Sequence, residues 1–183
     1  MDRLQLAHIL RAACEVTGDP DVIVLGSQSI LGTYDEDDLP PAATMSMEAD
    51  LAWLQDTAVR ERAEKVNGEI GELSGFHESN GYYPEGVSVE TATLPEGWQD
   101  RLHGWAVASS YPANARFLDK HDLAVSKLAA FREKDREFVA ALIEAGLVEP
   151  AIIRERVGLL PDRVAAVVPG RILSWLDSIS PIR

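Results

Sequence analysis

The chain contains 183 residues, a length that suits one domain or a core with a helical extension. Apolar residues make up 46% and charged residues 26%, as in soluble globular proteins, and no apolar run reaches the roughly 18 residues of a transmembrane helix. The net charge of −13 argues against a general nucleic-acid binder, because contacts to phosphate dominate that affinity.

The first segment, Arg3 to Val16, predicts an amphipathic helix, since Leu6, Ile9 and Leu10 fall on one stripe. It carries acids and lacks the basic start and apolar block of a signal peptide. Cys14, the single cysteine, excludes an internal disulfide and fits a reducing compartment. We therefore expect a cytoplasmic protein.

A glycine-serine turn follows the first predicted strand. Val22 to Leu25 is a short β-branched run, which is typical of a buried strand, and it ends abruptly at Gly26 and Ser27. Gly26 allows a sharp turn, and Ser27 is placed to cap a short helix from Gln28 to Gly32.

The next extended segment carries two acids on one face. If Thr44 to Leu51 is a strand, side chains alternate between its faces, so Ser46, Glu48 and Asp50 point the same way. Mg²⁺ prefers hard oxygen ligands, and one or two carboxylates plus substrate phosphates are enough to hold it. Glu48 and Asp50 beside the glycine-serine turn therefore predict a metal-phosphate site.

A glycine-rich stretch separates these acids from a third. Asp56 to about Val66 predicts a surface helix, and residues 68–86 read as a structured loop that contains His77. His77 is either an ordinary loop histidine or a contact to substrate. Gly86 to Thr91 predicts a third strand, on which Glu90 adds a third carboxylate to the pair.

The rest of the chain is predicted to be helical. Asp119 is a suitable N-cap, with Asp122 completing a capping box, and Lys127 lies on or beside the apolar stripe of that helix. Further helices are expected at Arg136–Ala145, which Asp135 starts, at Ala151–Val157, and at Asp162–Ile179 with a break near Pro169 and Gly170.

Several common sites are missing from the sequence. There is no Gly-x4-Gly-Lys-Ser/Thr loop, no Gly-x-Gly-x-x-Gly after a strand, and no Gly-x-Ser-x-Gly elbow. Ordinary P-loop and α/β-hydrolase chemistry are therefore not expected.

The order of the remaining motifs resembles the polymerase-β-type nucleotidyltransferase superfamily. The likeness rests on the helix–strand–Gly-Ser turn, the Glu48-x-Asp50 pair on the next strand, and the later helical stretch LAVSKLAAFREKDREF with Lys127 and Asp135. Within the superfamily the chain looks most like the minimal AbiEii/MenT-like toxins, over about residues 1–145. The resemblance implies an α/β (α+β) fold with a small mixed sheet flanked by helices. We expect a core at 1–118 and, from the helical pattern of the rest of the chain, a C-terminal helical region at 119–183 packed on it.

The resemblance also implies a reaction and roles for residues. Glu48, Asp50 and Glu90 would bind Mg²⁺, or Mn²⁺, while Gly26, Ser27 and Lys127 would hold the NTP and Asp135 would orient Lys127 or a base. The implied acceptor is the 3′ end of tRNA, and the implied role is a toxin neutralised by a protein antitoxin. The candidates for contact with acceptor RNA are Arg132, Lys134 and Arg136.

The distribution of charge keeps other functions open. Residues 1–114 hold 6 Lys/Arg and 20 Asp/Glu, whereas residues 115–183 hold 11 and 10. A polyanion is therefore expected to touch the second half of the chain, while the acidic first half suits metal ions or a basic partner. The excess of acid also fits nucleotide transfer to a protein or a small molecule, and a catalytically inactive binding or antitoxin module is the non-enzyme alternative.

Overall fold

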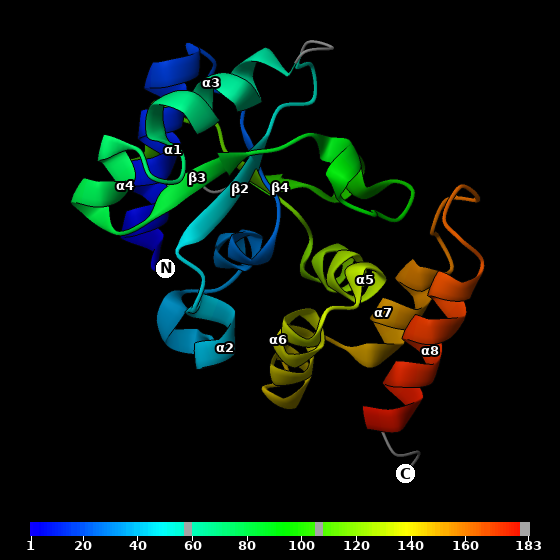
Figure 1. Cartoon of the computed structure of the whole chain (residues 1–183). Helices are drawn as coiled ribbons and strands as arrows, with labels where there is room; N and C mark the ends of the chain where they lie inside the picture. Colours follow the sequence, from blue (N-terminus) through cyan, green and yellow to red (C-terminus); the bar gives the residue numbers. More distant parts are fainter. Residues whose placement is uncertain (57–59, 105–107, 180–183) are drawn as a thin grey trace.

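A five-stranded mixed sheet forms the centre of the molecule in the computed structural model, which describes residues 1–56, 60–104 and 108–179 (Figure 1). The strands are β1 (Ile23–Val24), β2 (Glu48–Ala52), β3 (Tyr83–Gly86), β4 (His103–Gly104) and β5 (Arg116–Phe117), in the order β3-β2-β1-β5-β4. β2 pairs parallel to β3 and antiparallel to β1, and β5 pairs parallel to β1 and antiparallel to β4. This arrangement confirms the predicted mixed α/β fold.

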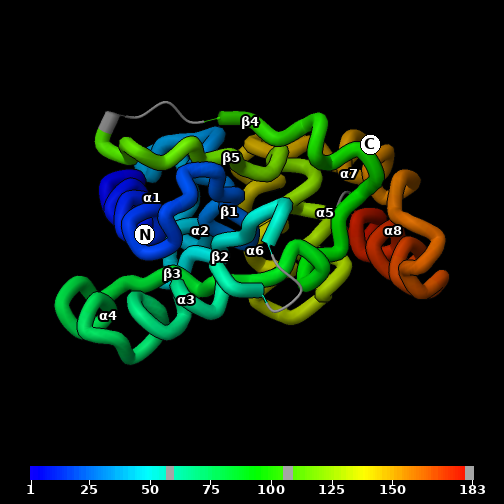
Figure 2. The backbone as a smooth tube through the Cα atoms, turned by 90° about the horizontal axis from the view of Figure 1, so that it is seen from above, coloured from blue at the N-terminus to red at the C-terminus, as the bar shows by residue number. Residues whose placement is uncertain are grey.

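The helices form two groups around the sheet. They are α1 (Arg3–Thr17), α2 (Pro41–Thr44), α3 (Glu61–Ile70), α4 (Gly75–Asn80), α5 (Lys120–Ala130), α6 (Glu133–Glu144), α7 (Pro150–Val157) and α8 (Val167–Ile179). Figure 2 shows α1, α3 and α4 at one end of the molecule, around β3, and α7 and α8 at the other end. α5 packs against α6, α7 and α8. None of the helices in the described part of the chain is long and apolar enough to cross a membrane.

The first helix forms as its sequence pattern predicts. Leu6, Ile9 and Leu10 are fully buried, so the apolar stripe packs into the core. Asp2 and Gln5 form a capping box at the start of α1, and Gly18 ends the helix in a left-handed conformation with φ 70°.

The predicted strand at Gly86–Thr91 is wrong. The strand is Tyr83–Gly86, and Val89–Thr91 forms a turn of 3₁₀ helix. Pro84 lies within the strand, which is possible because β3 is at the edge of the sheet, where a missing N–H leaves no ladder bond unmade. The stretch at 68–86, predicted as a loop, contains α4 and the whole of β3.

The C-terminal helices differ from the predictions mainly at their ends. Asp119 caps α5 by accepting hydrogen bonds from the backbone N–H groups of His121 and Asp122, as expected. The Asp122 carboxylate does not complete a capping box but binds Arg101. The expected break near Pro169 does not occur, because Pro169 is the third residue of α8, where its missing N–H removes no helical bond.

Candidate functional site

The turn after β1 requires glycine on two grounds. Gly26 has φ 60° and ψ −165°, a conformation that is essentially restricted to glycine. A Cβ atom at this position would lie 1.7 Å from Oδ2 of Asp50. The sharp turn therefore brings the backbone directly against the Asp50 carboxylate.

Ser27 does not cap the helix that follows. Gly26 occupies the N-cap position of the 3₁₀ helix Ser27–Gly32, and no side chain caps it. Ser27 is instead the first residue of that helix and is partly exposed beside Gly26.

Three carboxylates converge on the face of β2 and β3. Glu48 and Asp50 lie on one face of β2, and the parallel register places Asp50 beside Glu85 of β3. One oxygen of each of these three side chains lies within 4.8 Å of the others. Hard, closely spaced oxygen atoms are the donor set that Mg²⁺ prefers, so the residues present fit a divalent cation.

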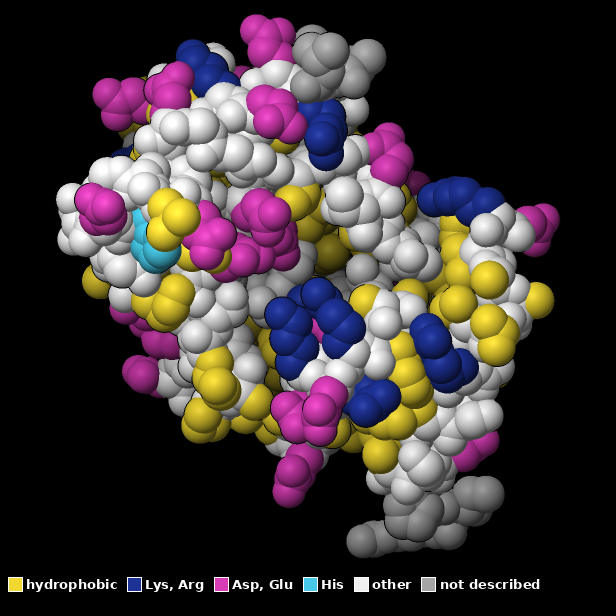
Figure 3. All heavy atoms as spheres, viewed as in Figure 1, with side chains coloured by type: hydrophobic (Ala, Val, Ile, Leu, Met, Phe, Trp, Pro, Cys, Tyr) yellow, Lys and Arg dark blue, Asp and Glu magenta, His cyan; other side chains and the backbone are white. Residues whose placement is uncertain are grey.

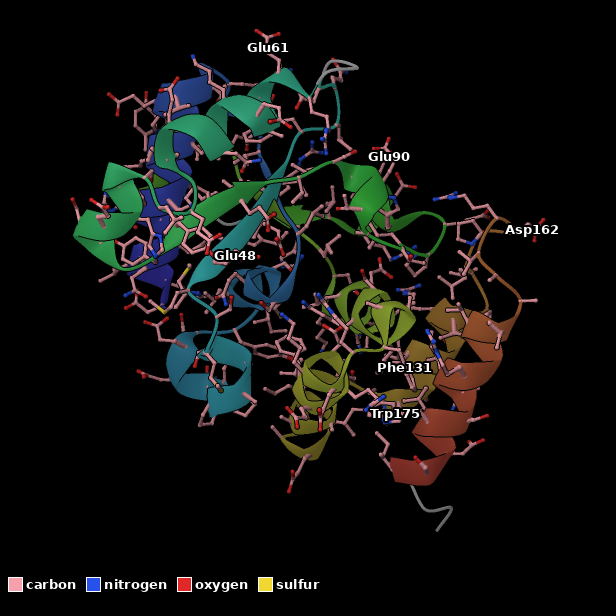
Figure 4. All side chains as sticks on the ribbon, viewed as in Figure 1. Glu48, Glu61, Glu90, Phe131, Asp162 and Trp175 are labelled. Atoms are coloured by element: carbon pink, nitrogen blue, oxygen red, sulfur yellow. The ribbon has the colours of Figure 1, made fainter. Side chains whose placement is uncertain are left out.

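Glu90, which the sequence predicts as the third acid, lies elsewhere. It is exposed in the 3₁₀ turn Val89–Thr91, and its carboxylate accepts a hydrogen bond from the Ser88 hydroxyl. Figure 4 shows Glu90 on the segment after β3, well away from Glu48. The prediction placed the third strand several residues too late, and Glu85 occupies the position expected for Glu90.

Burial and mutual repulsion raise the proton affinity of two of the three acids. Burial, followed by the charge of Glu48, raises the pKa of Asp50 to about 6. Burial and a hydrogen bond with Glu48 raise the pKa of Glu85 to about 7. Near neutral pH the cluster therefore holds negative charge that a cation would stabilise.

Tyr83 supports one member of the cluster. Its hydroxyl donates a hydrogen bond to Oε2 of Glu48 at 3.1 Å, and the two residues are register partners. Burial and this hydrogen bond raise the pKa of Tyr83 to about 12, so the phenol keeps its proton. The His77 ring packs against Tyr83, with ring centroids 4.4 Å apart. His77 therefore contacts the cluster through Tyr83.

Basic residues of α5 and α6 form the opposite side of the site. Lys127 has a side chain that is only 15% exposed, so it is not a lysine extended into solvent, and its Nζ lies 3.7 Å from Oδ1 of Asp135. Burial lowers the pKa of Lys127, and the charges of Asp135 and Asp50 oppose that shift.

Asp135 forms ion pairs with both Lys127 and Arg132 on this side of the site. It is buried, and its two oxygens accept hydrogen bonds from Nε and Nη2 of Arg132 at 2.6 and 3.1 Å. Burial alone would raise the pKa of Asp135, but the hydrogen bonds from Arg132 and the charge of Lys127 outweigh it, and the pKa is lowered. Asp135 does not begin its helix as predicted: α6 starts at Glu133, and Asp135 accepts a bond from the backbone N–H of Arg132.

The acidic and basic sides line one cleft. A cavity of about 330 Å³ is bounded by Gly26 and Asp50 on one side and by Lys127 and Arg132 on the other. Figure 3 shows acidic side chains over β2 and β3 facing basic side chains over α5 and α6, with a hollow between them. The structure thus brings together Gly26, Asp50 and Lys127, from segments far apart in the sequence.

Two further residues predicted to contact RNA lie on α6. Lys134 is exposed. Arg136 lies over the Phe131 ring, 4.9 Å from its centroid, and donates to the Phe131 carbonyl.

Sequence reasoning missed Glu85 and Tyr83. Their spacing of two residues places both on one strand face, but the intervening Pro84 argues against a strand from the sequence alone.

The comparisons with known proteins identify a family for the chain. A family model described as "Nucleotidyltransferase of unknown function (DUF6036)" matches residues 4–157 of the chain. No curated protein and no solved structure was found to match it. The matched segment includes the acidic cluster, the glycine-serine turn and the basic residues of α5 and α6, and the chain belongs to this nucleotidyltransferase family.

Proposed function

We propose that the protein transfers a nucleotide from an NTP to the 3′ end of tRNA in a Mg²⁺-dependent reaction, and that it acts as a toxin with a protein antitoxin. One observation carries the proposed chemistry. Asp50, one of the three clustered carboxylates, faces Lys127 across the cleft, beside the turn at Gly26. The carboxylates would face the positive metal ion of a metal-bound triphosphate, and the buried ammonium opposite them would face its negative phosphates.

Each side of the cleft has a separate task in this proposal. Glu48, Asp50 and Glu85 would hold Mg²⁺, which when bound neutralises the triphosphate and helps to align it. Ser27 and the backbone at Gly26 bind the terminal phosphates, and Lys127 adds a point charge. The Asp135 carboxylate, 3.7 Å from the Lys127 ammonium, holds that ammonium in place.

The reaction is an in-line displacement at phosphorus. The acceptor hydroxyl releases its proton to solvent as its oxygen forms a bond to the α-phosphorus, the bond between the α-phosphorus and the oxygen that bridges it to the β-phosphorus breaks, and pyrophosphate leaves. The side chains of the cleft orient the reactants and stabilise charge, which is the main requirement of phosphoryl transfer.

A labelling experiment tests the reaction and the acceptor together. Protein incubated with labelled NTPs, Mg²⁺ and total RNA is expected to label a band of tRNA size, and Asp50→Ala should abolish it. Asp37→Ala removes an exposed acid outside the cleft and serves as the matched control. Label in protein instead of RNA would contradict the tRNA acceptor, and no transfer to any acceptor would contradict the enzymatic function.

The toxin role is tested in cells. Expression of the wild-type chain should arrest growth, and Asp50→Ala should remove the arrest while Asp37→Ala keeps it. Arrest that persists in Asp50→Ala would separate the toxicity from the cleft. Growth that is never arrested would contradict the toxin role.

A cationic small molecule is the second candidate acceptor. A cavity of about 300 Å³ beside the carboxylate cluster is lined by Glu48, Asn67, Glu72, Tyr83 and Glu85. Three carboxylates around one cavity favour an amine. The labelling experiment distinguishes this acceptor, because its product would be a labelled compound of low mass, separable from RNA by thin-layer chromatography.

A further inference from the structure

Two arginines share one aromatic ring next to the cleft. Arg171 of α8 lies 4.4 Å and Arg136 of α6 lies 4.9 Å from the centroid of Phe131, measured from each guanidinium carbon. Phe131 ends α5 with a left-handed backbone, φ 60°, so its ring stands where α5 turns into α6. Figure 4 shows Phe131 at this junction, on the side that faces α8.

Backbone carbonyls hold both guanidinium groups in place. Arg171 donates from Nη2 to the Ala129 carbonyl at 2.8 Å, and Arg136 donates from Nη1 to the Phe131 carbonyl at 3.3 Å. Ala129 also lines the cleft, so the pair of arginines lies at its edge. A preorganised guanidinium loses less freedom when it binds an anion than a free surface arginine does.

No ion pair among the described residues neutralises the charge of these two arginines. Among the ion pairs of the described residues, none within 4.0 Å involves Arg136 or Arg171, although the chain carries 30 acids and 17 Lys/Arg. Nε of Arg171 is also buried without an acceptor. Each contact with the ring stabilises a cation by only about 0.5–1 kcal/mol, so both guanidinium charges remain available for an anion.

We propose that Phe131, Arg136 and Arg171, here called the arginine platform, bind the phosphodiester backbone of a single-stranded RNA end whose 3′ hydroxyl reaches the cleft. The inference rests on the proposed function, since it assigns where the acceptor lies. Guanidinium groups match phosphate geometry through paired N–H donors, and their planes can stack on unpaired bases. The platform is separate from Gly26, Ser27 and Lys127, which take the triphosphate.

The test measures RNA binding apart from catalysis. Wild type, Arg136→Ala/Arg171→Ala and Arg163→Ala are titrated with a fluorescein-labelled single-stranded RNA that ends in a free 3′ hydroxyl, at several salt concentrations. Arg163→Ala is the matched control, because Arg163 is exposed and its neighbour Asp162 lies in the connection between α7 and α8, away from Phe131 (Figure 4). NTP binding is measured by calorimetry on the same samples.

The expected result is specific to the platform. The double variant should bind RNA on the order of tenfold more weakly, with the slope of log K against log salt smaller by about 1.5, while Arg163→Ala changes the slope by less than about 0.5. NTP affinity and circular dichroism should stay at wild-type values. Phe131→Leu should weaken RNA binding with both charges kept, because the ring that orders them is gone.

Several outcomes overturn the inference. RNA affinity that is unchanged in the double variant, or wild type that does not bind RNA, removes the platform. An equal loss of NTP affinity assigns it to the triphosphate. Tighter binding of a poly-glutamate peptide than of RNA, lost in the double variant, assigns it to an acidic protein. If the platform binds RNA but wild type labels no RNA, the platform is an RNA site without the proposed reaction, and the assignment of the acceptor fails. If wild type labels RNA and the labelling persists unchanged in the double variant, the proposed reaction stands and the platform is overturned.

Discussion

Replacing Gly26 by alanine tests whether the glycine-serine turn and the acidic cluster form one unit. The added Cβ would lie 1.7 Å from Oδ2 and 2.8 Å from Cγ of Asp50. Both distances are shorter than any real Cβ contact, so either the turn or the carboxylate has to move. The substitution therefore perturbs the backbone and the metal site with a single methyl group.

The expected loss of stability has two parts, one from the backbone conformation of Gly26 and one from the contact with Asp50. A non-glycine residue in a sparsely populated backbone region costs about 1–3 kcal/mol, and the conformation of Gly26 is at the unfavourable end of that range. Gly81 provides the matched control, because it has φ 76° and no atom within 4 Å of the position that a Cβ would take. Gly81→Ala should lose about 1–2 kcal/mol from the backbone alone, whereas Gly26→Ala should lose about 3 kcal/mol or more.

Urea unfolding and calorimetry measure the two effects. Gly26→Ala should lower the free energy of unfolding more than Gly81→Ala does and should also abolish Mg²⁺ binding, whereas Gly81→Ala should keep Mg²⁺ affinity. If Gly26→Ala binds Mg²⁺ like wild type, the close approach of the turn to Asp50 is not functional. Equal destabilisation by the two substitutions would show that the contact with Asp50 is relieved without cost.

The remaining predictions concern the charges of the cleft. Asp50→Asn should abolish Mg²⁺ binding by calorimetry but leave the metal-free free energy of unfolding equal or higher, because a buried charge that repels Glu48 is gone; a large loss of stability would contradict this. Lys127→Met should weaken NTP binding by roughly 10–100-fold, the value of a charged hydrogen bond, and unchanged affinity would remove Lys127 from the site. Glu85→Gln should lower transfer far more than Glu90→Gln, and the opposite order would restore the acid predicted from the sequence. Because the folded pKa values of Asp50 and Glu85 are raised to about 6 and 7, the folded state binds more protons than the unfolded state between about pH 4 and pH 7. The stability from these two groups is thus present below about pH 4 and is lost as the pH rises through 7, while Mg²⁺ affinity increases over the same range; urea titrations showing stability that rises with pH without metal would contradict the assignment.

Local patterns explain what the sequence predicted correctly. The alternation of side chains along a strand placed Glu48 and Asp50 on one face, and the strand-ending glycine placed a turn beside them. The apolar stripe of α1 and the N-cap Asp119 of α5 also depend only on neighbours in the sequence. These features are fixed by residues within a turn of helix or a few strand positions.

The errors arise where pairing between distant segments decides the structure. Pro84 and the surrounding glycines argue against a strand, but the parallel edge position beside β2 accepts them and sets Glu85 opposite Asp50. In the same way, Asp122 has the spacing of a capping box and instead binds Arg101, 21 residues earlier in the chain. The third acid and the ion pairs of α5 depend on register and contacts that no local pattern records.

When nothing is bound, negative charge is unfavourable on one side of the cleft and positive charge is unfavourable on the other. On β2 and β3 the pKa values of carboxylates are raised, mainly by burial and by the charge of Glu48, so added positive charge would stabilise them. On α5 burial lowers the pKa of Lys127, so added negative charge would stabilise its ammonium. A cation alone or a phosphate alone satisfies one side. A metal-bound triphosphate satisfies both together, and the separation of the two charges across one cavity of about 330 Å³ is therefore the feature that best matches a nucleotide donor.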